Sequence, residues 1–91
     1  EAESQAVSLE SYLKKRRDEI LLLPIAQRDL EKLDPPVFRR VLEAIRTLSA
    51  NPRPNGSLKL TDEEGFRIRI GKIRILYRID DQAKKVFIYR I

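Results

Sequence analysis

Apolar and basic residues alternate between Gly65 and Tyr77, and the alternation runs on both sides of a central glycine, Gly71. Successive side chains of a strand point to opposite faces, so two short strands here would each place an apolar row on a core. The arginines between the apolar positions would then point the other way. The sequence therefore predicts a folded core and a basic surface built from one short segment.

The rest of the C-terminal half also has the pattern of β structure. Leu58-Lys59-Leu60 leads into a turn at residues 61–65, and Asp80-Asp81 opens the last hairpin. Alternation bounded by turn residues predicts three strands, near Phe66–Ile70, Ile73–Ile79 and Lys85–Ile91. Short turns between consecutive strands make these strands antiparallel neighbours.

The N-terminal half is predicted to contain a strand and a helix before residue 34. Residues 19–23 form a largely apolar run of strand length that Pro24 ends, which suits a central or an edge strand. Apolar residues then recur at helical spacing at Ala26, Leu30 and Leu33.

A further helix is predicted to begin after Asp34, which is placed to cap it, with Pro35 in its first turn. Its apolar face has spacings of four, four and three residues: Val37, Val41, Ile45 and Leu48. The helix should end before the loop at residues 51–56, whose prolines lack donors and whose Asn-Gly tolerates positive φ.

These elements indicate an α+β fold, with a small, curved, antiparallel-rich sheet and two to three helices on one face, in the order β-α-α-β-β-β. A single core should form between the sheet and the helices from these residues: Val41, Ile45, Leu48, Phe66, Ile68, Ile70 and Ile75. Residues 18–91 would form this domain. Residues 1–17 hold Val7, Leu9, Tyr12 and Leu13 in an amphipathic pattern, with Ser8 as an N-cap, which indicates a short additional helix.

Composition narrows the chemistry. The chain of 91 residues has neither Cys nor His, which removes disulfides, thiolate sites and the commonest metal ligand, so no cofactor or metal is expected. This composition suits a reducing cytoplasm. No apolar run approaches the ~20 residues of a membrane span, so no membrane association is expected.

The net charge of +5 is concentrated in the C-terminal half. Between Arg53 and Arg78 there are seven basic residues against three acidic ones. Such a basic surface indicates a polyanionic partner.

The order of several short motifs resembles the RelE/ParE toxin superfamily over residues 18–91. The motifs are Ile20-Leu21-Leu22-Leu23-Pro24, the segment 26–33, the Asn51-Pro52-Arg53-Pro54 loop, Leu58-Lys59-Leu60, Phe66-Arg67-Ile68-Arg69-Ile70-Gly71 and Arg74-Ile75-Leu76-Tyr77-Arg78-Ile79-Asp80. The resemblance implies a toxin of a toxin–antitoxin module that is neutralised by a cognate antitoxin. RelE-type members cut mRNA in the ribosomal A site, and ParE-type members poison DNA gyrase.

The resemblance also implies roles for single residues. Positions like Arg67 and Arg69 contact the RNA backbone and assist cleavage, and the position like Arg74 holds the scissile phosphate. Lys59 resembles a basic residue that contacts RNA phosphates, and Lys72 and Arg78 are further RNA-binding candidates. The implied reaction is metal-independent attack of an RNA 2′-hydroxyl on its neighbouring phosphate, with clustered cations stabilising the charge.

Two departures from the family pattern affect the predicted activity. Some RelE toxins carry lysine where this chain has Arg67 and Arg69, and arginine stays charged at any usable pH, so the general base is unassigned. RelE toxins continue beyond the last strand with a Gly-containing basic segment, whereas this sequence stops at Ile91. We therefore do not expect full activity from residues 1–91 alone. Tyr77 is an additional catalytic candidate, although a core aromatic is the more frequent role.

Other interpretations stay open at this stage. Alternating arginines on a strand are often only a solvated face. In a ParE-like gyrase inhibitor, the arginines would contribute little to the activity. In an attenuated RNA-binding domain, they would bind RNA without cleaving it. Residues 1–17 would be an extra toxin helix or the remnant of a fused antitoxin.

Overall fold

The structure is a computed structural model, and it describes residues 6–9 and 17–91. The elements in this part of the chain are β1 (Glu19–Leu22), α2 (Pro24–Glu31), α3 (Pro35–Ala50), β2 (Leu58–Lys59), β3 (Phe66–Ile70), β4 (Ile73–Asp80) and β5 (Lys85–Arg90). The helix expected within residues 1–17 falls mostly outside the described residues. None of the helices described is long and apolar enough to cross a membrane.

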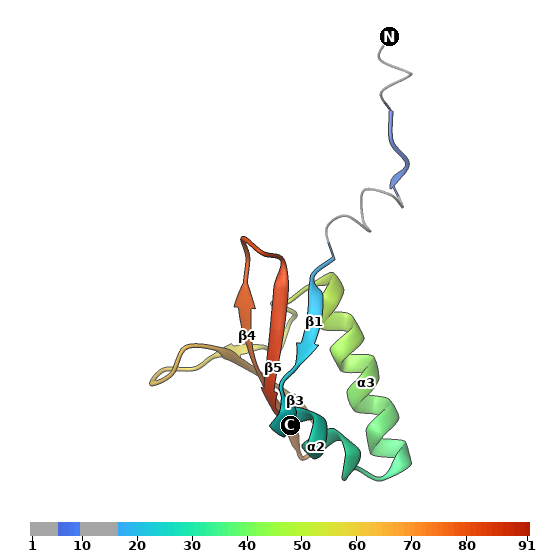
Figure 1. The fold of residues 1–91 in the computed structure, drawn as a ribbon, viewed down its shortest axis with the longest axis vertical. Helices are drawn as coiled ribbons and strands as arrows, with labels where there is room; N and C mark the ends of the chain where they lie inside the picture. Colours follow the sequence, from blue (N-terminus) through green and yellow to red (C-terminus); the bar gives the residue numbers. More distant parts are fainter. Residues whose placement is uncertain (1–5, 10–16) are drawn as a thin grey trace.

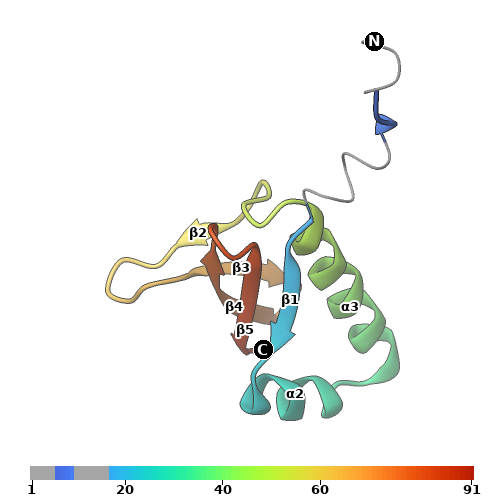
Figure 2. The same cartoon turned by 45° about the horizontal axis from the view of Figure 1, so that its top comes forward.

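The strands of the described chain form one five-stranded sheet in the order β1-β5-β4-β3-β2 (Figures 1 and 2). β1 runs parallel to β5, and the other neighbours are antiparallel. The predicted α+β class is confirmed, with both helices packed on one face of the sheet. The expected order β-α-α-β-β-β lacked one strand, because β2 has only two residues and its alternation is too short to recognise.

β1 is an edge strand, one of the two positions that its apolar run allowed. Its start is attached to the end of α3 by two hydrogen bonds. The Asp18 N–H donates to the Ser49 carbonyl at 2.8 Å, and the Ser49 hydroxyl donates to the Asp18 carbonyl at 2.7 Å. Because β1 and β5 are far apart in sequence, their parallel pairing closes the fold around α2 and α3.

Proline sets the start of both helices. α2 begins at Pro24, two residues before Ala26, where the predicted apolar face of this helix began. It ends at Glu31, short of the predicted end at Asp34. α3 begins at Pro35, and Asp34 occupies its N-cap as predicted, but the Asp34 side chain makes no capping hydrogen bond. The next residue, Pro36, also lacks an N–H, so one of the two donors that such a cap uses is missing.

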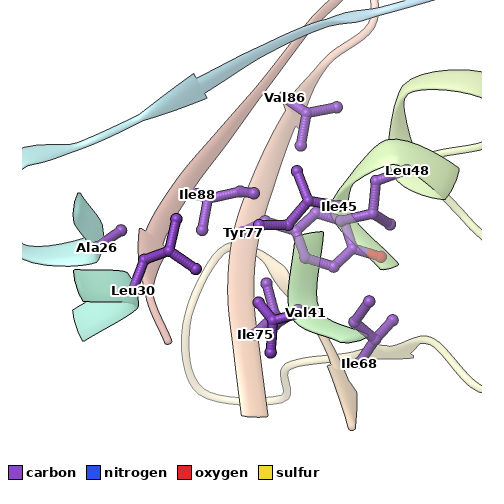
Figure 3. Close-up of a cluster of buried hydrophobic side chains, with 10 residues drawn as sticks. All are labelled: Ala26, Leu30, Val41, Ile45, Leu48, Ile68, Ile75, Tyr77, Val86 and Ile88. Carbon is purple, nitrogen blue, oxygen red and sulfur yellow. The ribbon is translucent and has the colours of Figure 1, made fainter. Parts of the chain in front are cut away.

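The predicted core is confirmed (Figure 3). Its buried members come from α2, α3 and the three central strands: Ala26, Leu30, Val41, Ile45, Leu48, Ile68, Ile75, Tyr77, Val86 and Ile88. Phe66 and Ile70 are half-buried against this cluster. We call the opposite side of the sheet, which neither α2 nor α3 covers, the open face.

Candidate functional site

A tight hairpin between β3 and β4 determines which arginines face one another. The two strands pair from Phe66 with Tyr77 to Ile70 with Ile73, and Gly71 and Lys72 form the turn. Gly71 has a φ of +61°, which the first central position of such a two-residue turn requires and which glycine adopts without strain. The turn therefore sets the register of the hairpin.

In this register Arg69 lies directly opposite Arg74 on the open face. Ile70 and Ile73 close the turn, so the arginine pair is a non-hydrogen-bonded pair, in which Cα atoms approach to about 4.5 Å and side chains lie close. Arg67 lies two residues along β3 on the same face. We call Arg67, Arg69 and Arg74 the arginine cluster.

No carboxylate of the described residues forms an ion pair with the arginine cluster. Within residues 6–9 and 17–91, ion pairs are formed by other arginines: Arg46 with Glu43, Arg53 with Asp81 and Arg90 with Asp29. Like charges directly opposite in a sheet are destabilising. An anion between the guanidinium groups would relieve this repulsion, and phosphate oxygens match their forked donors.

The other predicted RNA-binding residues lie around the cluster in different ways. Lys72 is exposed in the turn beside the Arg69–Arg74 pair. Arg78 is exposed on the open face farther along β4, and its guanidinium carbon lies 5.2 Å from the centre of the Tyr89 ring. Lys59 pairs with Phe66, whose side chain faces the helices, so the backbone register directs Lys59 away from the open face.

Tyr77 lies in the core, as the alternative interpretation of this residue expected. Its side chain is fully buried, and its hydroxyl donates a hydrogen bond of 2.7 Å to the Pro52 carbonyl. Burial raises the pKa of the Tyr77 phenol. A buried, protonated hydroxyl on the side of the sheet opposite the arginine cluster does not exchange protons with a substrate bound there.

One polar contact near the site was missed by the sequence analysis. Arg53 donates two hydrogen bonds to Asp81, at 3.1 and 3.0 Å, and its guanidinium lies 5.3 Å from the centre of the Phe66 ring. These bonds lower the pKa of the Asp81 carboxyl and raise the pKa of Arg53. The contact joins two loops that are 28 positions apart, and no local pattern signals such a pairing.

A second unpredicted contact holds the end of β5 against α2. The Asp29 carboxylate accepts a hydrogen bond from the Ile91 backbone N–H and forms an ion pair with Arg90 Nε, both at 3.0 Å. The same oxygen, Oδ2, serves both donors. Asp29 thereby fixes the direction of the backbone at Ile91.

The Arg69–Arg74 pair itself was available from the sequence. The two residues are equally far from the Gly71-Lys72 turn, so a two-residue hairpin places them opposite each other. The alternation alone predicted a shared face for Arg67 and Arg69, and the cross-strand pair was not predicted.

Comparisons with known proteins agree with this architecture. Residues 20–91 match the family described as the ParE toxin of the type II toxin–antitoxin system, parDE. The chain is similar to the toxin RelG of Mycobacterium tuberculosis, with 41% identity over 68 residues that cover 72% of this chain and 78% of RelG.

Solved structures with this fold include toxin–antitoxin complexes. The RelBE2 complex of Mycobacterium tuberculosis matches with a TM-score of 0.73 and 35% identity, over 81% of this chain and 94% of the matched chain. The RelE–RelB complex of Pyrococcus horikoshii OT3 has a TM-score of 0.71 over 81% and 91% of the two chains, and its 22% identity supports the fold alone. The chain therefore belongs to the RelE/ParE family of type II toxin–antitoxin toxins.

Proposed function

We propose that this toxin is an endoribonuclease that cuts mRNA on the ribosome, with the arginine cluster holding the phosphodiester that is cut. The observation that carries the proposal is the Arg69–Arg74 pair, two guanidinium groups held opposite each other without a carboxylate from the described residues. The pair lies on a face that neither α2 nor α3 covers. A bound phosphate would convert the repulsion between the two arginines into two favourable contacts.

The reaction needs stabilisation of negative charge more than any other assistance. The RNA 2′-oxygen attacks the adjacent phosphorus, the bond from phosphorus to the 5′-oxygen breaks, and a 2′,3′-cyclic phosphate and a 5′-hydroxyl result. Charge builds on the phosphate oxygens as the bond to the 2′-oxygen forms. Fixed donors directed at those oxygens stabilise the transition state without reorganisation.

Proton transfer needs groups outside the arginine cluster. One proton leaves the 2′-hydroxyl and one reaches the departing 5′-oxygen. Guanidinium groups stay protonated at neutral pH and do not act as bases. The cluster therefore binds and stabilises charge, and a proton acceptor and a proton donor act beside it.

Cleavage by translating ribosomes supplied with purified toxin tests the proposal. Arg74→Ala should lower the cleavage rate by ~10²-fold or more, the scale for loss of one preorganised donor. Arg67→Ala and Arg69→Ala should each lower it too, less than additively in combination, because the three cations act on one phosphate and its neighbours.

Arg39→Ala is the matched control, since Arg39 is an exposed arginine on α3, away from the open face. It should leave cleavage unchanged. Wild-type cleavage and growth arrest by the triple alanine variant of the cluster, at equal soluble level and with normal thermal unfolding, would disprove the ribonuclease proposal.

Inhibition of DNA gyrase is the second candidate function, because the matching family is described by its ParE member. Sheet-face arginines would then contribute little to toxicity. Induction of the toxin, followed by parallel measurements of protein synthesis and plasmid supercoiling, separates the two candidates. Loss of supercoiling before loss of protein synthesis would favour the gyrase function.

We also propose that a cognate antitoxin neutralises this chain, as its family membership and the solved complexes of its relatives support. Such a partner should cover the arginine cluster or the elements beside it, burying on the order of 2,000 Å² or more. Co-expression with the product of the neighbouring gene should yield a complex that is stable through purification. Arg67, Arg69 and Arg74 should be less accessible to a guanidinium-modifying reagent in that complex than in the free toxin.

A further inference from the structure

A second feature of the open face is a cavity of about 710 Å³ between the base of the β2–β3 hairpin and the β4–β5 hairpin. The β2–β3 hairpin projects to one side of the sheet (Figures 1 and 2). The lining includes Leu23, Glu64, Arg78, Asp80 and Phe87. The cavity combines an aromatic ring, an arginine and carboxylates.

Gly65 brings Glu64 to this cavity. The backbone at Gly65 has a φ of +137°, and a Cβ there would lie 2.9 Å from the Tyr77 carbonyl oxygen and 3.3 Å from the Tyr89 hydroxyl. Only glycine lets the chain pass so close to β4 and β5. The Leu60 N–H donates to the Gly65 carbonyl at 3.0 Å and closes the loop, so Glu64 is held at the rim.

Glu64, at the rim of the cavity, has a carboxylate whose oxygens are available to accept hydrogen bonds. It forms no ion pair with any residue in the described ranges 6–9 and 17–91. Asp80, in contrast, accepts the Ala83 N–H at 3.0 Å through Oδ1, and Asp81 is bonded to Arg53. Glu64 can therefore use both oxygens for a ligand.

Phe87 forms part of the floor of the cavity. It pairs with Arg78 across β4 and β5 and is half-buried on the open face. Arg78 stacks over Tyr89 rather than over Phe87, so the Phe87 ring has no cation above it among the described residues. A partly exposed aromatic ring beside free acceptors suits a planar ligand that carries N–H donors.

The cavity and the arginine cluster lie at different positions along the same face of β4. Arg74 and Arg78 share the open face four residues apart, a separation of about 13 Å in an extended strand. A strand of nucleic acid whose phosphate lies on Arg69 and Arg74 can therefore reach the cavity with a neighbouring base. A cationic side chain of a protein partner would be repelled by the same arginines.

We propose that this cavity is a base-binding subsite for guanine in single-stranded RNA, with Phe87 stacking on the base and Glu64 accepting its N1–H and N2–H donors. Guanine presents two adjacent donors to the two oxygens of one carboxylate. Uracil has one such donor flanked by carbonyls, which the carboxylate repels. The assignment rests on the proposed endoribonuclease function, because it takes the phosphate on the arginine cluster as its starting point.

Binding of short RNAs to the isolated toxin tests the subsite without cleavage. The probes are fluorescent oligouridines with one central guanosine, inosine or uridine, and 2′-O-methyl riboses block the attacking hydroxyl. Inosine differs from guanosine only by the missing N2 amino group. The guanosine probe should bind about tenfold more tightly than the other two, as a bidentate contact to a base edge discriminates on that scale.

Substitutions assign the preference to its residues. Glu64→Gln should bring the guanosine-to-inosine ratio of affinities close to one. Glu63→Gln, in the same loop but outside the cavity lining, should keep the wild-type ratio. Phe87→Leu should weaken all three probes by about tenfold, the scale of one lost base–aromatic stack. Arg74→Ala should weaken all three while keeping the ratio.

The outcomes separate the subsite from the ribonuclease function. Salt-dependent binding of all three probes with equal affinity would overturn the guanine subsite and leave the ribonuclease proposal standing. Absence of any RNA binding at low salt would overturn the subsite together with phosphate binding by the cluster. Saturation of the cavity by an arginine-containing peptide, lost in Glu64→Gln and without base preference, would assign it to a protein partner and overturn the subsite.

Discussion

The two faces of the sheet differ in what stabilises them, although residues of the two faces alternate along the same strands. On the face toward α2 and α3, apolar side chains such as Ile75 and Val86 are completely buried, and no charged residue of the described chain is buried with them. On the open face, arginines lie opposite each other without carboxylate partners from the described chain. The first arrangement lowers the free energy of the folded chain by itself. The second is favourable only with an anion present.

This difference separates stability from function within one hairpin. Because neighbouring residues of β4 point to opposite faces, a substitution at one position should act on folding and a substitution at the next should act on binding. The unfavourable charge pair persists because the core face determines the register of the strands. We therefore expect the toxin to tolerate loss of its arginines better than loss of any core residue.

The largest expected effect is on the core face. Ile75→Ala should lower the free energy of unfolding by about 2–5 kcal/mol, because it removes a fully buried side chain and leaves a cavity. Denaturant unfolding monitored by circular dichroism measures the change. The control is Leu76→Ala, the next residue on the open face and half-buried, which should cost clearly less. Equal losses for the two variants would mean that the faces are not energetically distinct.

A smaller effect is expected from the two tyrosines. Tyr77→Phe removes the buried hydrogen bond to the Pro52 carbonyl and should cost about 1 kcal/mol of unfolding free energy. Tyr89→Phe should be neutral or stabilising, because the Tyr89 hydroxyl is buried without a hydrogen-bond partner among the described residues. Thermal and denaturant unfolding of both variants provide the comparison. A destabilised Tyr89→Phe would show that the hydroxyl has a partner in solution.

On the open face, a substitution should raise the free energy of unfolding and not lower it. Arg69→Thr should raise the unfolding free energy by about 0.2–1 kcal/mol, since it removes one member of a like-charge cross-strand pair and threonine suits a strand. The gain should shrink as salt screens the repulsion. Arg78→Thr is the control in the same hairpin, because Arg78 faces Phe87 instead of a cation. A loss of stability in Arg69→Thr at low salt would contradict the repulsive pair.

The smallest expected effect concerns the exposed Arg53–Asp81 contact. Asp81→Asn should lower the melting temperature slightly near pH 7. The pKa of Asp81 is lowered in the folded state, so its contribution is present above the unfolded value of about 3.9 and disappears as the pH falls through the folded pKa. Melting curves of wild type and variant should therefore converge as the pH falls through the folded pKa of Asp81. Asp62→Asn, in the β2–β3 loop, is the control, and a constant difference at all pH values would exclude the ion pair as its cause.

Much of this architecture was predicted from local patterns. The alternation from Phe66 to Tyr77 determined which side chains enter the core and which arginines lie on the other face, because a strand has a fixed period of two residues. The spacing from Val41 to Leu48 determined the buried face of α3 for the same reason, with the helical period. These predictions depend only on residues that are close together in the sequence.

Other features of the fold and site depended on residues that are distant in the sequence. The parallel pairing of β1 with β5, the Arg53–Asp81 contact and the attachment of Ile91 to Asp29 each join separate segments. The side of the sheet toward which Lys59 points followed from its pairing with Phe66. The strand that contains Lys59 has only two residues, which is too short for an alternation to be recognised. Tertiary packing determined these contacts, because the local sequence around each residue is compatible with many different partners.

The sequence by itself determined most of the secondary structure, although not the two-residue strand β2, and it determined the composition of the core, the basic character of one sheet face and the resemblance to RelE/ParE toxins. It did so because period and turn chemistry are local properties of the chain. Only the tertiary structure decided the edge position of β1, the burial of the Tyr77 hydroxyl against Pro52 and the cavity between Glu64 and Phe87. Each of these depends on the distance between segments that are far apart in the sequence.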